Sequence, residues 1–182
     1  MTIERDVRLS DVAITLEPGD EAAPLQPLIH GLTLRLSSTA LTKLAAQAVK
    51  LASARAPVEV HLTGCRLVDG GVEVSARAGK GFMGADVTAQ LAITAAGDTV
   101  RVALANLDAP RWLPTASMIE MALGKASQIS GIRPDPQNNQ AVLVNPAEIL
   151  VRKGLPARLA PGAWEVAIDP AALHLAYREQ RE

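Results

Sequence analysis

Four short segments between residues 58 and 104 alternate apolar with polar positions and predict strands. A period of two places all the apolar side chains of a strand on one face. Asp69-Gly70-Gly71 and Ala96-Gly97-Asp98 are typical of tight hairpin turns, and residues 79–84 form a looser connection. Short connections favour an antiparallel meander with one buried and one solvated face. The apolar positions are Val58-Val60-Leu62, Val72-Val74-Ala76, Val87-Ala89-Leu91-Ile93 and Val100-Val102-Leu104.

Helical periodicity stands on both sides of these strands. Residues 38–55 carry apolar side chains at i, i+3, i+4, i+7, i+8 and i+11 from Leu41 onward, behind the N-cap candidates Ser37 and Ser38. A second stripe, over 114–129, begins behind a proline that suits the first turn of a helix. One apolar sheet face and two apolar helix stripes must be buried together, which predicts a shared interior.

The two ends of the chain predict further strands. The alternation over residues 7–16 slips by one position at Ser10-Asp11, which indicates a bulge. Glu17-Pro18-Gly19-Asp20 predicts a turn and the stretch to Pro27 a loop, before alternation resumes over 28–36.

A short internal repeat follows the second helix. Residues 142–151 and 166–175 share a strand-like run, an Asx-Pro-Ala step and a second apolar run, at an offset of 24 residues. Two copies are too few for a solenoid. The copies are interpreted either as two hairpin-like units on one sheet or as paired walls of one cavity.

The net charge and the low aromatic content argue against nucleic acid as a partner. The formal net charge of −1 supplies no field that would attract nucleic acid. Aromatic residues make up only 2% of the chain, so the interior must be filled by aliphatic side chains and platforms for base stacking are not expected. The N-terminal segment lacks the apolar region of a signal peptide, and no apolar run is long enough to span a membrane, so a cytoplasmic location is expected.

Residues that carry chemistry are few and scattered. His30, His61 and His174 lie singly, without other ligands at metal-binding spacing, and no cofactor is expected. Cys65, the only cysteine, ends an apolar run and is interpreted as a small core residue. Gly79-Lys80-Gly81 lacks the spacing of a phosphate-binding loop.

The helix stripes are rich in alanine, which favours either close packing on the sheet or an under-filled interior. A dry apolar cavity accepts apolar ligands without loss of hydrogen bonds, and an acyl chain is the obvious candidate. Three large residues in predicted loops, Phe82, Met83 and Trp112, either cover the end of the sheet or form a lip that contacts a membrane. The expected lining residues are Leu41, Leu44, Ala48, Leu91, Ile93, Val102, Leu104, Ile119 and Leu123.

The order of the predicted elements resembles that of the tubular lipid-binding (TULIP) superfamily, and most closely its small LmeA-like bacterial phospholipid-binding proteins. The stretches that carry the resemblance are 37–41, 71–74, 112–114 and 164–177. The resemblance implies a long helix held in a curved antiparallel sheet with lipid in the seam, and it implies no catalytic residues.

These observations predict a single α+β domain over residues 1–182, in which a strongly curved antiparallel meander wraps around two amphipathic helices. Residues 28–130 would form the helix–meander–helix core and 141–178 the repeated strand–turn units. The expected function is non-enzymatic binding or transfer of a lipid or other long apolar ligand; peripheral membrane contact and a homodimer are left open. The alternatives are a protein–protein interaction module with a fully packed core, or an enzyme that uses His61, Cys65 or His174.

Overall fold

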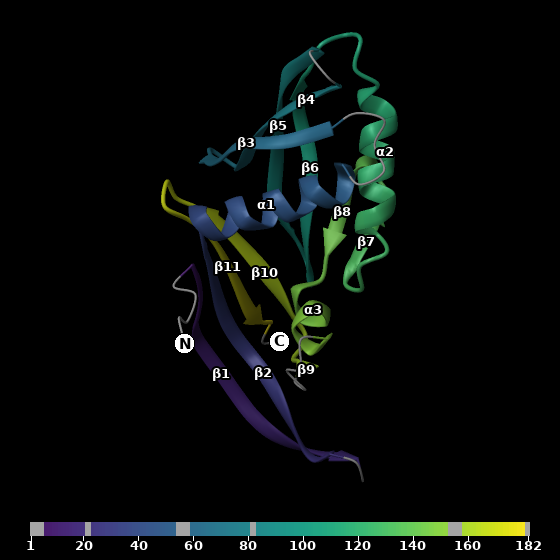
Figure 1. Cartoon of the computed structure of the whole chain (residues 1–182). Helices are drawn as coiled ribbons and strands as arrows, with labels where there is room; N and C mark the ends of the chain where they lie inside the picture. Colours follow the sequence, from purple (N-terminus) through teal and green to yellow (C-terminus); the bar gives the residue numbers. More distant parts are fainter. Residues whose placement is uncertain (1–5, 21–22, 54–58, 81–82, 153–157, 181–182) are drawn as a thin grey trace.

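The computed structural model describes residues 6–20, 23–53, 59–80, 83–152 and 158–180. Within these residues the chain is mostly antiparallel sheet, arranged as two sheets with three helices, in agreement with the predicted α+β class. Figure 1 shows one sheet and two of the helices at the top of the view and the other sheet below them.

The six-stranded sheet contains the predicted meander. Its order is β3 (Glu59–Val68), β4 (Gly71–Lys80), β5 (Met83–Ala96), β6 (Thr99–Asp108), β8 (Asn138–Val144) and β7 (Ile132–Asp135), with antiparallel pairing throughout. The two tight turns lie where they were predicted, and each uses a glycine with positive φ, 72° at Gly70 and 64° at Gly97. The prediction of a four-stranded antiparallel meander is confirmed.

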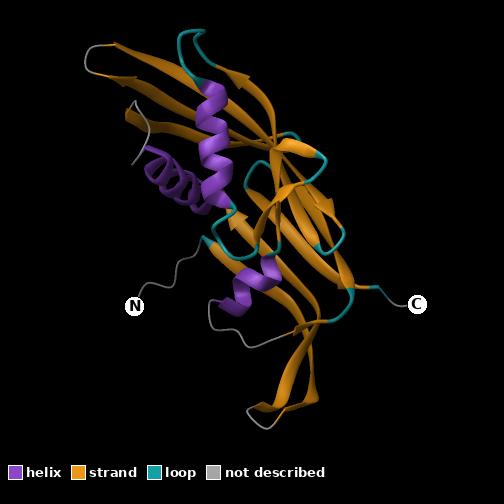
Figure 2. Ribbon diagram, turned by 90° about the vertical axis from the view of Figure 1, so that its right-hand side faces the viewer, coloured by secondary structure: helices purple, strands orange, loops and turns teal. Residues whose placement is uncertain are grey.

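The five-stranded sheet joins the two ends of the chain. Its order is β1 (Val7–Asp20), β2 (Ala23–Ser37), β11 (Ala172–Glu179) and β10 (Gly162–Ile168), and the short β9 (Arg158–Leu159) pairs in parallel with β2. The β1–β2 hairpin extends beyond the rest of the chain at the bottom of Figures 1 and 2.

The bulge predicted near Ser10-Asp11 is confirmed. The register between β1 and β2 shifts between Ser10 and Ala13, and Asp11 has a φ of 51°. The predicted turn at 17–20 and loop to Pro27 are wrong, because Glu17 pairs with Gln26 and Pro18 with Leu25. A proline is tolerated there because β1 is an edge strand, where a ladder hydrogen bond can be missing.

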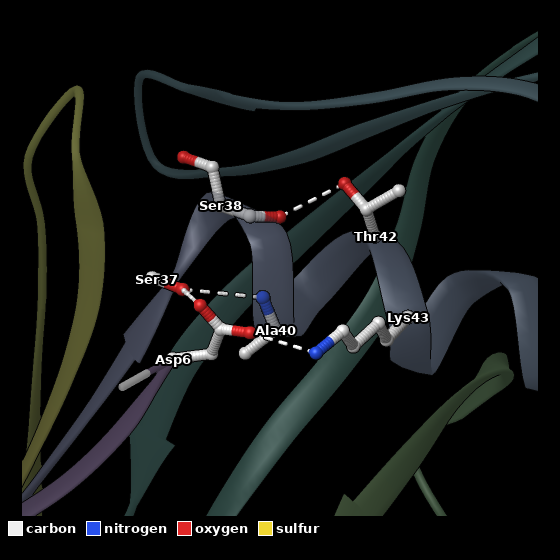
Figure 3. A network of polar contacts seen from close by, with 6 residues as sticks. All are labelled: Asp6, Ser37, Ser38, Ala40, Thr42 and Lys43. Carbon is white, nitrogen blue, oxygen red and sulfur yellow. Dashed lines mark hydrogen bonds and ion pairs between the residues drawn. The ribbon is translucent and has the colours of Figure 1, made fainter. Parts of the chain in front are cut away.

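The first predicted helix is α1 (Ser38–Ser53), and Ser37 is its cap. The Ser37 hydroxyl oxygen accepts a hydrogen bond from the Ala40 backbone N–H at 3.2 Å (Figure 3). Asp6, just before β1, contacts the first turn of α1. Its carboxylate lies 2.8 Å from the Lys43 Nζ and accepts a 3.5 Å hydrogen bond from the Ser37 hydroxyl (Figure 3). A capped first turn of this kind stabilises a helix by about 1 kcal/mol.

The second predicted helix is α2 (Thr115–Ala126), and the third helix is α3 (Pro146–Arg152). α3 corrects the interpretation of the repeat as two hairpin-like units on one sheet. After Asn145 the first copy continues as this helix, whereas after Asp169 the second copy continues as β11, and the two copies belong to different sheets.

The described core lies where the two sheets meet. The Trp164 and Tyr177 rings contact each other, with centroids 5.2 Å apart, and the Tyr177 hydroxyl donates to the backbone carbonyl of Ala160. The backbone N–H of Trp164 donates at 2.8 Å to the carbonyl of Gly97, so the β5–β6 turn is joined to β10. The buried residues of this cluster are Ile29, Leu32, Val100, Trp164, Leu173, Leu175 and Tyr177.

Candidate functional site

An apolar groove lies between the meander and α2, with a cavity volume of about 240 Å³. β3 to β6 form one wall, α2 the other, and α1 contributes one residue. Of the described lining residues only Thr115 has a polar side chain. The lining is Val49, Val60, Val74, Ala76, Val87, Ala89, Leu107, Leu113, Thr115, Met118, Ile119, Met121 and Ala122.

The sheet wall follows directly from the alternation and register of the strands. Val74 pairs with Ala89, Ala76 pairs with Val87, and Ala89 also pairs with Leu107 on β6, so each of these cross-strand pairs contains an alanine. Paired residues share a face and lie close together. A methyl group opposite each valine leaves space that two branched side chains would have filled.

α2, which forms the other wall of the groove, is fixed in place by a buried residue just before it, although no residue of the helix itself is buried. Leu113, only 5% exposed, anchors the chain just before α2, and its backbone N–H donates at 3.0 Å to the Pro110 carbonyl. α2 itself contains no buried residue; Met118, Ile119 and Met121 are half-buried. The apolar side of α2 therefore faces the groove and stays partly accessible.

The predicted lining residues separate into four groups. Ile119 lines the groove, and Leu104 lies with Ile119 in a second pocket beside β6 and α2, whose lining is more polar. Leu41 and Ile93 pack against the described core instead. Three more, Leu91, Val102 and Leu123, are half-buried outside the groove.

The remaining pair, Leu44 and Ala48, is exposed on α1, Leu44 to 52%. The reason is the orientation of α1, which turns Ala40, Leu41 and Val49 inward. The buried stripe of α1 is thus narrower than the periodicity predicted.

Sequence reasoning missed most of the sheet wall, although the signal was present. The groove lies at the end of the meander formed by residues 60, 74–76 and 87–89, whereas the predicted lining lay farther along, at 91–93 and 102–104. A hairpin turn at Asp69-Gly70 already implies that residues near 60 and 76 approach each other, so the missed residues could have been grouped from that turn.

Of the three predicted lip residues, one can be placed. Trp112 is 57% exposed and directly precedes the buried Leu113, so an indole stands in solvent next to a groove-lining residue. Phe82 and the side chain of Met83 lie outside the described part of the chain. In this loop Leu113 is therefore the residue buried against the sheet side of the groove, and the Trp112 indole is not.

None of the described residues that line the groove has an ionisable side chain. His174 Nε2 lies 2.8 Å from an oxygen of Asp169, and His30 lies between Thr15, at 2.7 Å, and Glu179, at 3.2 Å. No three His, Cys, Asp or Glu side chains gather as a candidate metal site among residues that the structure describes.

Cys65 is half-buried on β3. Burial raises the pKa of its thiol, and a hydrogen bond with Thr42 partly offsets that effect. It is absent from the groove lining. The groove lining thus consists of an apolar surface and one hydroxyl.

Comparison of the chain with protein-family models, curated proteins and solved structures finds no match. No helix in the described ranges combines the length and apolar character needed to cross a membrane.

Proposed function

We propose that the groove between the meander and α2 binds an apolar ligand, and that the ligand is part of a single acyl chain of a lipid. The observation that carries this proposal is the lining itself, with twelve apolar residues and one threonine around about 240 Å³. Such a surface gains about 0.8 kcal/mol for each buried methylene and loses no hydrogen bonds on filling.

The volume sets the size of the guest. It lies just below the range of about 300–1,000 Å³ typical of pockets for drug-sized ligands. One segment of an acyl chain suits this space better than two chains. Because the lining carries no charge, a charged head group would stay outside, where the exposed indole of Trp112 is suited to contact an interface.

The finer architecture of this proposal is a curved meander that wraps around α1 and α2, as the resemblance to tubular lipid-binding proteins implies. In that arrangement lipid would enter beside α2, whose half-buried methionines can adapt to ligands of different shape.

Ligand binding can be tested by native mass spectrometry after mild purification, followed by titration with a fluorescent fatty acid. Ala122→Trp would place an indole in the groove from an exposed position of α2, so it should not disturb the core. The matched control is Ala46→Trp, the same change on the exposed side of α1.

We expect Ala122→Trp to weaken fatty-acid binding at least tenfold and Ala46→Trp to leave it unchanged. Equal binding by both variants would show that ligand binds elsewhere. Absence of co-purifying lipid together with absence of uptake by the wild type would favour the interaction module with a packed core.

A further inference from the structure

The β1–β2 hairpin carries large apolar side chains that face solvent, most of them on the edge strand β1. Six such side chains on the β1–β2 hairpin have exposed fractions between 40% and 64%. They are Val7, Leu9, Val12, Ile14, Leu16 and Leu25. Single exposed apolar residues are ordinary, but several large ones on one hairpin indicate an interaction site.

The bulge in β1 brings these residues onto one face. Leu9 pairs with Leu34, which packs against the core, and Ile14 pairs with Ile29, which belongs to it. Paired residues share a face, so Leu9 and Ile14 both lie on the core side of the sheet. An odd number of positions separates Leu9 from Ile14, and also Leu34 from Ile29, and the two register shifts, between Ser10 and Ala13 and between Ala13 and Ile14, accommodate this. Without the bulge, the second half of β1 would turn its apolar residues to the opposite face.

The edge itself is open among the described strands. β1 is the terminal strand in the order β1-β2-β11-β10, and its hairpin projects from the molecule (Figure 1). Open edges offer unpaired N–H and C=O groups to another strand, and proteins usually protect them with charges or prolines. β1 carries a bulge, Pro18 near its end and a few charges, and between them it still exposes a row of large apolar side chains.

The charges on β1 indicate which strand fits this edge. Arg8 and Glu17 lie in opposite halves of β1, and neither forms an ion pair within the described residues. If a second β1 runs antiparallel so that Arg8 faces Glu17 of the other copy, Leu9 faces Leu16 and Ser10 faces Thr15. Paired residues must lie on the same face of a sheet. Because the bulge lies between the two halves of β1, each residue of these pairs lies on the same face as its partner.

We propose that two copies of this chain join edge to edge through β1 in that register. An antiparallel pair of identical strands has twofold symmetry, so each favourable pair occurs twice. The contact would continue the β1-β2-β11-β10 sheet across the dimer and partly cover the exposed apolar row. A strand edge is a narrow interface, and we expect a dissociation constant on the order of micromolar.

Charge exchange tests the register. Arg8→Glu and Glu17→Arg each place two like-charged pairs in the interface, whereas the double variant Arg8→Glu/Glu17→Arg restores opposite charges. Arg111→Glu, a charge reversal at an exposed residue outside β1, is the control. The measurement is sedimentation velocity over a concentration series, with circular dichroism to verify that each variant is folded.

The expected result is a wild-type dimer, at least tenfold weaker association for each single variant, and recovery in the double variant and the control. A wild type that remains monomeric at the highest concentrations overturns the proposal. So does a double variant that fails to recover, or a monomer that instead co-sediments with phosphatidylcholine vesicles through the apolar row. Fatty-acid binding should persist in all these variants, so the result is independent of the groove.

Discussion

Gly71, the first residue of β4, is a position at which one methyl group should disturb the meander. A Cβ built on Gly71 would lie 2.0 Å from the backbone oxygen of Leu91 and 3.2 Å from the Cα of Ala92. Both contacts are with the backbone of β5, so no side chain can move aside. Gly124, on the exposed side of α2, is the opposite case: no atom lies within 4 Å of an added Cβ.

The geometry gives the size of each effect. A Cβ at Gly71 must withdraw by about 1 Å to reach an acceptable contact, which separates β4 from β5 and strains the 3.1 Å hydrogen bond from Ile93 to the Gly70 carbonyl. Overpacking of this kind costs about 1–3 kcal/mol and a weakened backbone hydrogen bond about 1 kcal/mol more, so we expect Gly71→Ala to lower the free energy of unfolding by roughly 3 kcal/mol. Gly124→Ala should raise it by about 0.8–1 kcal/mol through helix propensity.

Thermal unfolding followed by circular dichroism separates the two variants. For a chain of this size each kcal/mol shifts Tm by roughly 2–4 °C, so Gly71→Ala should melt about 6–12 °C below the wild type and Gly124→Ala about 2–4 °C above it. A Gly71→Ala variant as stable as the wild type would refute the close approach of β4 and β5. A destabilised Gly124→Ala variant would refute the exposed position of that face of α2.

Three further predictions follow from titratable groups. Hydrogen bonds from the Ala171 N–H, and then from His174, lower the pKa of Asp169. The ionised carboxylate therefore stabilises the folded state above about pH 4, and this contribution is lost as the pH falls through the lowered pKa. We expect Asp169→Asn to make the free energy of unfolding less dependent on pH on the acid side. The raised pKa of Cys65 predicts slower reaction with a thiol reagent than in the urea-unfolded chain, and equal rates would contradict it. Burial, and then the charges of Asp98 and Glu179, raise the pKa of Tyr177. Because it is the only tyrosine, titration of the phenolate absorbance should give a midpoint above about 10. Tyr177→Phe should lower the free energy of unfolding by about 1 kcal/mol, since it removes the hydroxyl's hydrogen bond.

The alternation of residues 58–104 was sufficient to predict the meander because local and long-range preferences agree there. Each predicted strand has one apolar face and is followed by a short connection, so its nearest neighbour in sequence is also its partner in the sheet. The alternation also predicted which face of the sheet is buried, but not which residues of that face line the groove. It could not tell which end of the shared face would be filled, because that depends on where β10 and α2 pack against it.

The Asx-Pro-Ala steps show where local sequence is insufficient. Asn145 uses its side-chain oxygen to accept a hydrogen bond from Glu148 N–H at 3.2 Å and starts α3. Asp169 likewise accepts from the N–H three positions on, that of Ala172, at 2.8 Å, and starts a hairpin turn. The two local interactions are alike, and the difference lies in a distant partner: β11 finds β2, pairing at Leu175 with Leu34.

The scarcity of aromatic residues explains why packing differs between the two ends of the interior. Trp164 and Tyr177, half of the chain's four rings, fill the junction of the two sheets, and Trp112 is exposed. The end of the meander beside α2 must be filled by aliphatic residues, and its sheet wall carries Ala76 and Ala89 opposite valines. An alanine cannot reach across the distance that separates a sheet from a helix resting on it, so space remains there. A low content of aromatic residues therefore gives a filled junction and an open groove in one protein.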